Sequence, residues 1–590
     1  MAYPSRTQDA LQHGGLGGAL RKSRRSVRWV CVRWGVVGGD GSWSGVRRPL
    51  SSTPVPFRPM VSSLLPRSVA TFVAAAAVAV PIAGCGGGSS AGGDAGADPA
   101  AFLPASSPAY VEAQVRPGGD LKTNAEAVAR KVLATSDPSG KLVGLLDKAL
   151  ADQGGSYEKD IAPWLGTRAG LAVTGAGAAG GNGTPDLAAA IASKDDAAAE
   201  AFLAREQGTT QREYRGVTYR YKSADDLATA VVDHAVVAGT ERGFKSAIDA
   251  QQGDALADAA AFKKARTTVG TDGLGFAYVD PSRAFDLALG AAGSAGGAGA
   301  AKGLQQAQML KGLLAGSGLQ SVAAKLDVAA DAVRIDAAAI GLKTGTAGAQ
   351  GDGPGAAAAV PAGSWLSVGI GDIGGAVTRQ LAQLGASGAT GGIDPAAILQ
   401  QFSGSLGLDV QKDLLSWMGD GAIFVRGTSM TDLNGALVVQ SKDPAKSTAA
   451  IGKIHKLLST FGIKTGALTG VAGAEGLTVG AGSLPDAIEV AAKGDKFVIA
   501  YGHAALKDAL AGGAPLGDTA PFKTAAALLG GAKPSLFLDT PQVVTLLASR
   551  AGSDPSFAKA KPTLDAFGPA AAGVTSEGDV TRVKIAVAVP

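Results

Sequence analysis

Cysteine and histidine are both scarce in this sequence of 590 residues. The two cysteines are Cys31 and Cys85, so residues 86–590 can hold neither a disulfide framework nor a thiolate metal site. Residues 101–590 contain no G-x-S-x-G elbow, and the three histidines after Cys85 do not form a spacing such as H-x-x-x-H. These absences argue against an enzyme, and we expect no catalytic, cofactor-binding or metal-ligating residue. The three histidines are His234, His455 and His503.

The apolar run Val69–Val80 is about twelve residues long, too short for a membrane-spanning helix of about 20. It follows Met60 and the single cation Arg67, and small residues lead from it to Cys85. This is the three-part layout of a secretory signal. We therefore predict a signal peptide over 60–84.

The end of this segment, Ile82-Ala83-Gly84-Cys85, resembles the lipobox of bacterial lipoproteins. The resemblance implies that the Cys85 sulfur receives a diacylglycerol and that cleavage makes Cys85 the first mature residue. Two or three acyl chains such as palmitate are sufficient for stable anchoring. We expect a protein anchored by lipid to the outer face of the cell membrane. The Gly-, Ala- and Ser-rich segment 85–100 would be a flexible tether.

The net charge of +4 is unevenly distributed. Residues 1–59 hold ten Lys or Arg against two Asp, a net charge of +8, and Arg67 adds one more, so residues 85–590 carry a net −5. A basic surface for nucleic acid is therefore not expected in the body of the protein. Residues 1–59 lack periodicity, which favours a mis-assigned start with Met60 as the initiator; the alternative is a basic cytoplasmic extension.

Internal similarity divides the body into two parts. KDIAPWLGTRAGLAV (159–173) matches KDLLSWMGDGAIFV (412–425), and LGFAYVDPSRAFDLAL (274–289) parallels SLFLDTPQVVTLLAS (535–549). We expect two tandem copies of one domain. Their bounds would be 101–345 and 358–590, with 346–357 as a structureless linker.

The order of elements in one copy mixes hairpins with helices. Strands are predicted over Ala109–Val115 and Gly275–Val279, helices over about 122–152, 157–164, 196–206, 241–250 and 259–268, and a closing hairpin over 322–340. The strict alternation of a doubly wound sheet is missing. We therefore predict an α+β fold, mostly antiparallel sheet with helices packed on one face.

Several patterns suggest sites but have simpler explanations. Of two G-x-G-x-x-G matches, only Gly369–Gly374 lies between a predicted strand and helix, and no acidic residue follows it at about twenty residues. Gly175–Gly180 is followed by a loop, so we reject it. Trp164 and Trp417 recur at matched positions and are interpreted as core residues rather than ligand-stacking ones. Asp280 and Asp539 end apolar strands and are interpreted as helix-start residues.

The body as a whole resembles a family of uncharacterised, Ala/Gly-rich secreted lipoproteins of actinobacteria, a domain of unknown function. The shared features are the lipobox, Leu103-Pro104-Ala105, Trp164-Leu165-Gly166 and the strands that end in Asp. The resemblance implies an exported envelope protein and supplies no activity. We expect a non-enzymatic binding protein with an apolar cleft for a lipophilic or other small ligand. The alternatives are a structural lipoprotein that binds an envelope protein, and a hydrolase built around His234 or His503.

Overall fold

In the computed structural model, the described residues are 96–150, 155–177, 185–294, 308, 311–312, 314–342, 351–386, 409–480 and 486–590. All of them belong to one compact unit, 60–590. The basic N-terminal segment, the predicted signal peptide, Cys85 and most of the tether lie outside the described residues, so the structure does not test them.

Ten strands form the first half of a large antiparallel sheet. They are β1 (Ala109–Gln114), β2 (Leu165–Gly175), β3 (Asp186–Ser193), β4 (Thr210–Tyr214), β5 (Val217–Lys222), β6 (Leu227–Val232), β7 (Ala235–Gly239), β8 (Gly275–Val279), β9 (Ser321–Ala329) and β10 (Ala332–Ile340). Their order in space is β4-β5-β6-β7-β3-β2-β1-β8-β9-β10.

Ten further strands repeat this arrangement. They are β11 (Leu366–Ile370), β12 (Met418–Arg426), β13 (Asn434–Ser441), β14 (Thr465–Ala467), β15 (Glu475–Val479), β16 (Ile488–Lys493), β17 (Lys496–Tyr501), β18 (Leu536–Leu538), β19 (Ala570–Glu577) and β20 (Val580–Ala588). Their order, β14-β15-β16-β17-β13-β12-β11-β18-β19-β20, is that of the first half with each strand replaced by its counterpart.

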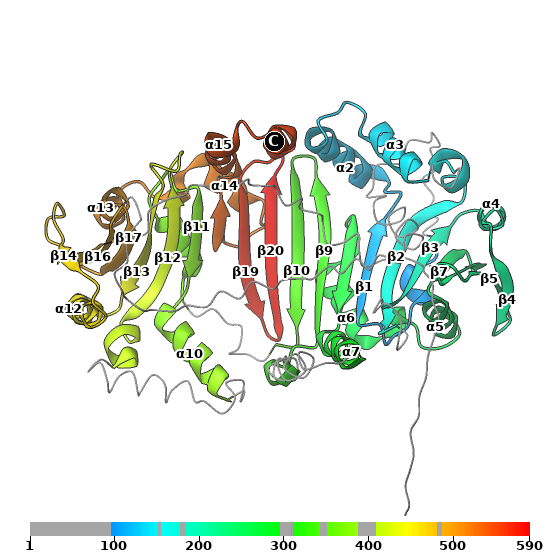
Figure 1. Cartoon of the computed structure of the whole chain (residues 1–590), viewed down its shortest axis with the longest axis horizontal. Helices are drawn as coiled ribbons and strands as arrows, with labels where there is room; N and C mark the ends of the chain where they lie inside the picture. Colours follow the sequence, from blue (N-terminus) through cyan, green and yellow to red (C-terminus); the bar gives the residue numbers. More distant parts are fainter. Residues whose placement is uncertain are drawn as a thin grey trace, which may run out of the picture. The chain divides into compact units, whose positions relative to one another are not determined.

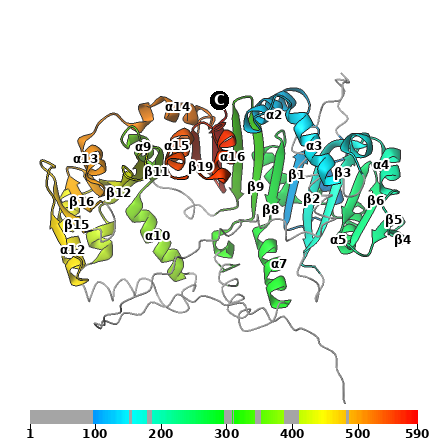
Figure 2. The ribbon, with the colours of Figure 1, turned by 45° about the horizontal axis from the view of Figure 1, so that its top comes forward.

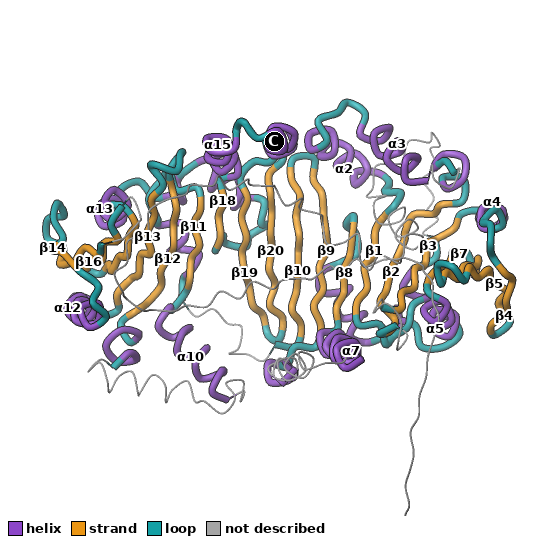
Figure 3. The backbone as a smooth tube through the Cα atoms, in the orientation of Figure 1, coloured by secondary structure: helices purple, strands orange, loops and turns teal. Residues whose placement is uncertain are grey.

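The two sets of strands join through β10 and β20. These strands pair along their whole length, from Ala332 opposite Ala588 to Ile340 opposite Val580. The result is one sheet of 20 strands. β4 and β14 lie at its two edges, β10 and β20 lie at its centre, and the strands between follow in matching order on both sides. Figure 3 shows β9, β10, β20 and β19 side by side. The prediction of an α+β fold with a mostly antiparallel sheet is confirmed.

Helices connect the strands. They are α2 (Gly119–Val132), α3 (Pro138–Leu150), α4 (Asp196–Leu203), α5 (Glu241–Gln251), α6 (Ala260–Val269), α7 (Pro281–Ser294), α9 (Gly353–Ala359), α10 (Ile373–Ala386), α12 (Pro444–Thr460), α13 (His503–Ala511), α14 (Ala520–Ala527), α15 (Thr540–Ala551) and α16 (Pro555–Leu564). Short helical turns are η2 (Pro99–Phe102), η4 (Tyr157–Ile161), η5 (Leu256–Asp258), η6 (Val410–Leu415) and η7 (Leu516–Asp518).

Two of these helices differ from the sequence expectation. The helical region predicted over 122–152 is interrupted between α2 and α3, where Asp137 accepts a hydrogen bond from the Gly140 amide and Pro138 begins the next helix. Part of the expected linker is helical, because α9 begins inside it. The Asp352 side chain caps α9 by accepting a hydrogen bond from the Gly355 amide.

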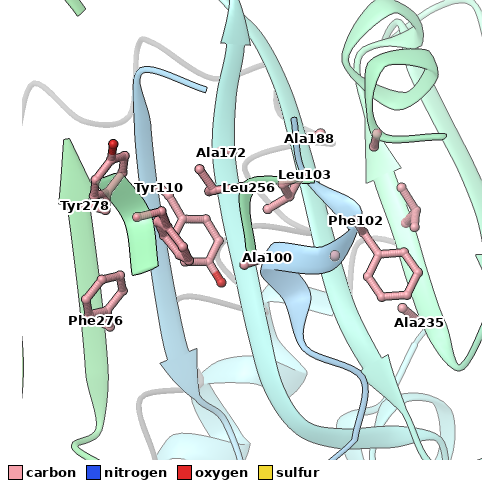
Figure 4. Close-up of a cluster of buried hydrophobic side chains, with 14 of the residues drawn as sticks. Ala100, Phe102, Leu103, Tyr110, Ala172, Ala188, Ala235, Leu256, Phe276 and Tyr278 are labelled. Atoms are coloured by element: carbon pink, nitrogen blue, oxygen red, sulfur yellow. The ribbon is translucent and has the colours of Figure 1, made fainter. Parts of the chain in front are cut away.

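One face of the sheet, here called the helix-covered face, is buried under α5 and α6 in the first half and under α9, α13 and α14 in the second. Its core is aromatic in both halves. Tyr110 and Phe276, which Figure 4 shows on neighbouring strands, pack with Phe262 of α6, and Phe537 packs on Phe522 of α14. Alternate residues of each strand point into this core, as the pleat requires.

The other face is covered only in part. In the first half, α3, α4 and η4 pack around the buried Trp164, and in the second, α12 and η6 pack around Trp417. Helices thus lie on both faces, not on one as the sequence suggested. Over the central strands, α2 packs against β9 and covers part of this face. Figures 1 and 2 show α2, α15 and α16 at one end of those strands and α7 and α10 at the other.

Candidate functional site

The histidines occupy separate sites. Each has its Nδ1 atom near a side-chain oxygen: His234 near Asp196 (2.8 Å), His455 near Thr465 (2.6 Å) and His503 near Glu489 (3.0 Å). A hydrolase would also need a nucleophile on the other ring nitrogen. No described hydroxyl hydrogen-bonds to Nε2 of these histidines, and none of the three lines the two cavities described below. Of the partners that a hydrolase would need, the described residues supply a carboxylate to His234 and to His503.

Both tryptophans are core residues. Trp164 and Trp417 are almost completely buried, and each indole Nε1 donates to a main-chain oxygen four residues earlier, that of Asp160 (2.7 Å) and Asp413 (3.0 Å). Phe497 packs on Trp417 at 4.8 Å between ring centroids. Because the polar atom is satisfied and the rings are enclosed, the core interpretation is confirmed.

The two strand-end aspartates also have structural roles. Asp280 accepts a hydrogen bond from the Arg283 amide at the start of α7 (3.1 Å), which is a capping contact. Asp539 is the residue before α15, but its carboxylate accepts from the Gln542 side chain (2.8 Å) instead of a backbone amide. The helix-start interpretation holds at both sites, by different bonds.

The glycine turn over 369–374 does connect a strand, β11, with a helix, α10. Its space is occupied by protein: a Cβ on Gly369 would lie 1.9 Å from the Gly353 oxygen. The Asp372 amide donates to the Asp420 carboxylate at 2.8 Å. Because the space is filled and this amide already has a partner, the turn does not form a dinucleotide site. Part of the other glycine pattern, 175–180, lies outside the described residues.

A buried ionic cluster joins the start of the fold to its core. The Arg266 guanidinium of α6 binds Asp98 (2.6 and 3.0 Å) and Glu112 (2.6 Å). Glu112 also accepts from the Tyr110 hydroxyl at 2.8 Å and lies 3.3 Å from Arg168. Arg266 is 154 and 168 positions away from its two acidic partners, so no local motif could have revealed the cluster.

The protonation states in this cluster follow from burial and from the neighbouring charges. Burial, reinforced by the Glu112 carboxylate, raises the pKa of Tyr110 well above its ordinary value, so the hydroxyl remains a donor. Burial would also raise the pKa of Asp98, but the hydrogen bond and charge of Arg266 outweigh it and the pKa is lowered. Arg266 forms ion pairs with both Asp98 and Glu112, which indicates a structural clamp on the chain at Asp98.

The candidate functional surface is an apolar strip on the partly covered face. One row of directly paired residues crosses eight neighbouring strands: Ile335, Ile585, Ala572, Leu536, Val368, Ile423, Leu437 and Ile499. A second row crosses six strands: Val111, Ala277, Ala324, Ala337, Val583 and Val574. We call these two rows the open strip.

Every residue of the open strip is apolar, yet seven of them have exposed side chains, between 36% and 47%. A sheet face that meets water normally carries polar side chains at these positions. At a strand spacing of ~4.8 Å, the first row spans ~34 Å. An exposed apolar patch of this extent is typical of an interaction surface.

The sequence analysis missed the open strip, although the signal was present. Strands β10 and β20, AVRIDAAAI and VTRVKIAVA, carry apolar residues on both alternating faces in much of their length. Such a pattern indicates that both faces avoid water, but it does not say whether a helix or a ligand covers the second one.

Two of the cavities lined by described residues have charged side chains in their walls, unlike the apolar cleft that was expected. One, of about 180 Å³, has polar walls that include Glu200, Tyr219 and Arg220. The other, of about 300 Å³, lies on the helix-covered face where β9, β10 and β20 meet, and is here called the seam cavity. Lys325, Arg334, Asp336 and Lys584 contribute to its walls.

Neither a membrane-spanning helix nor a metal site is found in the described part of the chain. No helix there is long and apolar enough to cross a bilayer. No three His, Cys, Asp or Glu residues in the described ranges gather closely enough to hold a metal ion.

Comparison with known proteins identifies the family. The family model described as "Protein of unknown function (DUF3352)" matches residues 68–589. The chain therefore belongs to this family. The curated proteins contain no significant match.

Solved structures of TP0453 show a weak similarity. Crystal form IV has 10% identity and a TM-score of 0.22, covering 41% of this chain and 80% of that chain. Crystal form I has 11% identity and the same TM-score, covering 43% and 82% respectively. A similarity at this level supports no conclusion about fold or function.

Proposed function

We propose that this member of the DUF3352 family is a non-enzymatic binding lipoprotein, anchored at Cys85 to the outer face of the cell membrane, that holds a lipophilic ligand on the open strip. The observation that carries the proposal is the exposure of apolar side chains along rows that cross the centre of the sheet. At ~25 cal/mol per Å², covering ~300 Å² of such surface contributes ~7 kcal/mol before the cost of association.

The anchoring part of the proposal rests on the sequence. Ile82-Ala83-Gly84-Cys85 has the lipobox pattern, and the preceding run is that of a signal peptide. The family match begins at residue 68, within the predicted signal 60–84. We infer that the protein is an exported envelope lipoprotein of the actinobacterial type, with Met60 as its initiator.

We also infer that the body is a tandem duplication. The sequence matches between the two halves and the recurrence of one strand order support this inference. In this interpretation both copies contribute their four central strands to the open strip, and the second copy also contributes β12, β13 and β17. The outer part of each copy packs around one tryptophan, Trp164 or Trp417.

The test compares two neighbouring residues of β19. Val574 belongs to the open strip, and Thr575 is also exposed but points to the opposite face. Lipids are extracted from the purified full chain and identified by mass spectrometry. We expect Val574→Glu to reduce the copurifying lipid several-fold, whereas Thr575→Glu retains the wild-type amount. Equal amounts in all three proteins would reject the open strip as the binding surface.

A protein partner is the second candidate, because the open strip is flat and extends across eight strands, further than one small ligand needs. A structural lipoprotein would dock an envelope protein there. Crosslinking of the acylated protein in its own membrane would then capture a defined partner, and Val574→Glu would abolish the capture without changing the lipid content.

A further inference from the structure

The seam cavity has an unusual electrostatic composition. Asp336 lies directly opposite two lysines, Lys325 on β9 and Lys584 on β20. Arg334, two residues before Asp336 on β10, points to the same face of the sheet. An Arg582 nitrogen lies 3.8 Å from the Asp336 carboxylate. Four cations therefore lie on the helix-covered face around two carboxylates, Asp336 and Asp327, and Asp327 is directly opposite Arg334.

These charges are not balanced within the protein. Lys325 forms an ion pair with Asp272 at 2.8 Å. Within the described ranges, Arg334 and Lys584 form no ion pair within 4 Å. Arg334 Nε and Asp336 Oδ1 are buried without a hydrogen-bond partner. Buried polar groups almost always have a hydrogen-bond partner. The partner missing here would accept a hydrogen bond from Arg334 Nε and donate one to Asp336 Oδ1.

The surroundings fit a small ligand. The cavity volume of about 300 Å³ is at the lower end of the range for small-molecule sites. Asp327, Ile335 and Ile585 also line the cavity, and the rest of its wall is Ala527–Gly530, at and beyond the end of α14. A Cβ on Gly530 would lie 3.7 Å from the Lys584 Nζ. The Lys584 ammonium group therefore lies close to the apolar segment Ala527–Gly530, where its charge is less screened than in open water.

The geometry points to a phosphate-binding site in the seam cavity, with Arg334 and Lys584 as the residues that bind the anion and Asp336 as acceptor for a hydroxyl of the same ligand. A doubly charged phosphate matches the two unpaired cations better than a carboxylate does. Ile335 and Ile585 of the open strip also line the cavity, but strand alternation points the side chains of Arg334, Asp336 and Lys584 to the opposite face. The phosphate site therefore does not rest on the proposed function.

The same group could come from a free phosphorylated solute or from a lipid headgroup. Two probes distinguish them: inorganic phosphate, and short-chain phosphatidylglycerol below its micellar concentration. Both are titrated by calorimetry into the full chain at low and at physiological salt. Binding of inorganic phosphate that weakens with salt indicates a free solute, and tighter binding of the short-chain lipid indicates a headgroup.

The variants are chosen to separate binding from folding. Arg334→Gln and Lys584→Gln are each expected to weaken binding about tenfold. Lys264→Gln, which removes an exposed cation paired with Asp579 at 2.7 Å, is the matched control and should bind within twofold of wild type. Lys584→Gln alters a half-buried side chain, so it reports on binding even where Arg334→Gln unfolds. Failure of both probes to bind, or equal binding by Lys584→Gln, would overturn the proposal.

Discussion

Asp336 and Lys584 face each other at the middle of the central strand pair. Each is the fifth residue of a nine-residue strand, β10 or β20, and the ladder extends four residues to either side of them. Opposite charges at directly paired positions stabilise a sheet, whereas like charges there destabilise it. The pair therefore favours β10–β20 pairing over the pairing of either strand with a copy of itself.

Charge reversal tests this relationship. Lys584→Glu places a carboxylate opposite Asp336 and should lower the free energy of unfolding by about 1 kcal/mol, since the site is only half-buried. Adding Asp336→Lys should recover most of the loss. Urea denaturation of the two single variants, the double variant and wild type gives the coupling. Additive losses in the double variant would contradict a direct interaction.

Removing the guanidinium of Arg266 should be strongly destabilising. Arg266→Met leaves Asp98 and Glu112 without their shared cation, and the loss of one partner from a buried pair costs about 3 kcal/mol or more. Arg130→Met is the control, because Arg130 forms an exposed pair with Glu126 and should change stability by less than ~0.5 kcal/mol. Chemical denaturation measures both; similar losses would reject the structural clamp.

The stabilising effect of Asp98 should depend on pH. The pKa of Asp98 is lower in the folded protein than its ordinary value, because Arg266 outweighs the opposing effect of burial. Its contribution is therefore present above the unfolded pKa of about 3.9 and is lost as pH falls through the lower folded pKa. The stability difference between wild type and Asp98→Asn should be constant near pH 7 and shrink below about pH 4. A difference that stays constant to pH 2 would contradict the assignment.

Truncation of Trp417 should affect stability and not ligand binding. Trp417→Ala removes a buried aromatic ring and should cost about 3–5 kcal/mol. Phe461→Ala, at a side chain that is 63% exposed, should cost little. Thermal unfolding measures both. A stable Trp417→Ala variant that has lost its ligand would instead support the stacking interpretation.

Two substitutions test the leader. Cys85→Ala should move the protein from the membrane fraction to the soluble or precursor fraction, because no acyl chain can be attached. Met60→Leu should abolish expression if Met60 is the initiator. Immunoblots of fractionated cells show both outcomes. A full-length product that begins at Met1 would disprove the start-site interpretation.

Much of the fold could be predicted because the determinants are local. The strands predicted over Ala109–Val115 and Gly275–Val279 are β1 and β8 of the structure, and Asp280 before Pro281 marked the start of α7. The break between α2 and α3 was missed, because the helical periodicity continues on both sides of Pro138. The signal for the break is a single capping residue, Asp137, which periodicity does not detect.

The candidate sites could not be predicted, because they depend on register between distant strands. Ile335 and Ile585 are 250 positions apart and become neighbours only through the pairing of β10 with β20. The partner of Arg266 is likewise a residue near the start of the fold, Asp98. The alternation shows that Ile585 and Lys584 point to opposite faces, but it does not show which face remains open.

The clamp on Asp98 also limits how far the fold can lie from its anchor. About 13 residues separate Cys85 from Asp98, and a fully extended chain of that length reaches at most ~45 Å. In the proposed anchored protein, with Cys85 in the bilayer, the sheet could rotate and tilt but would stay within this distance of the membrane surface. A ligand or partner would then bind within the first few nanometres of the membrane.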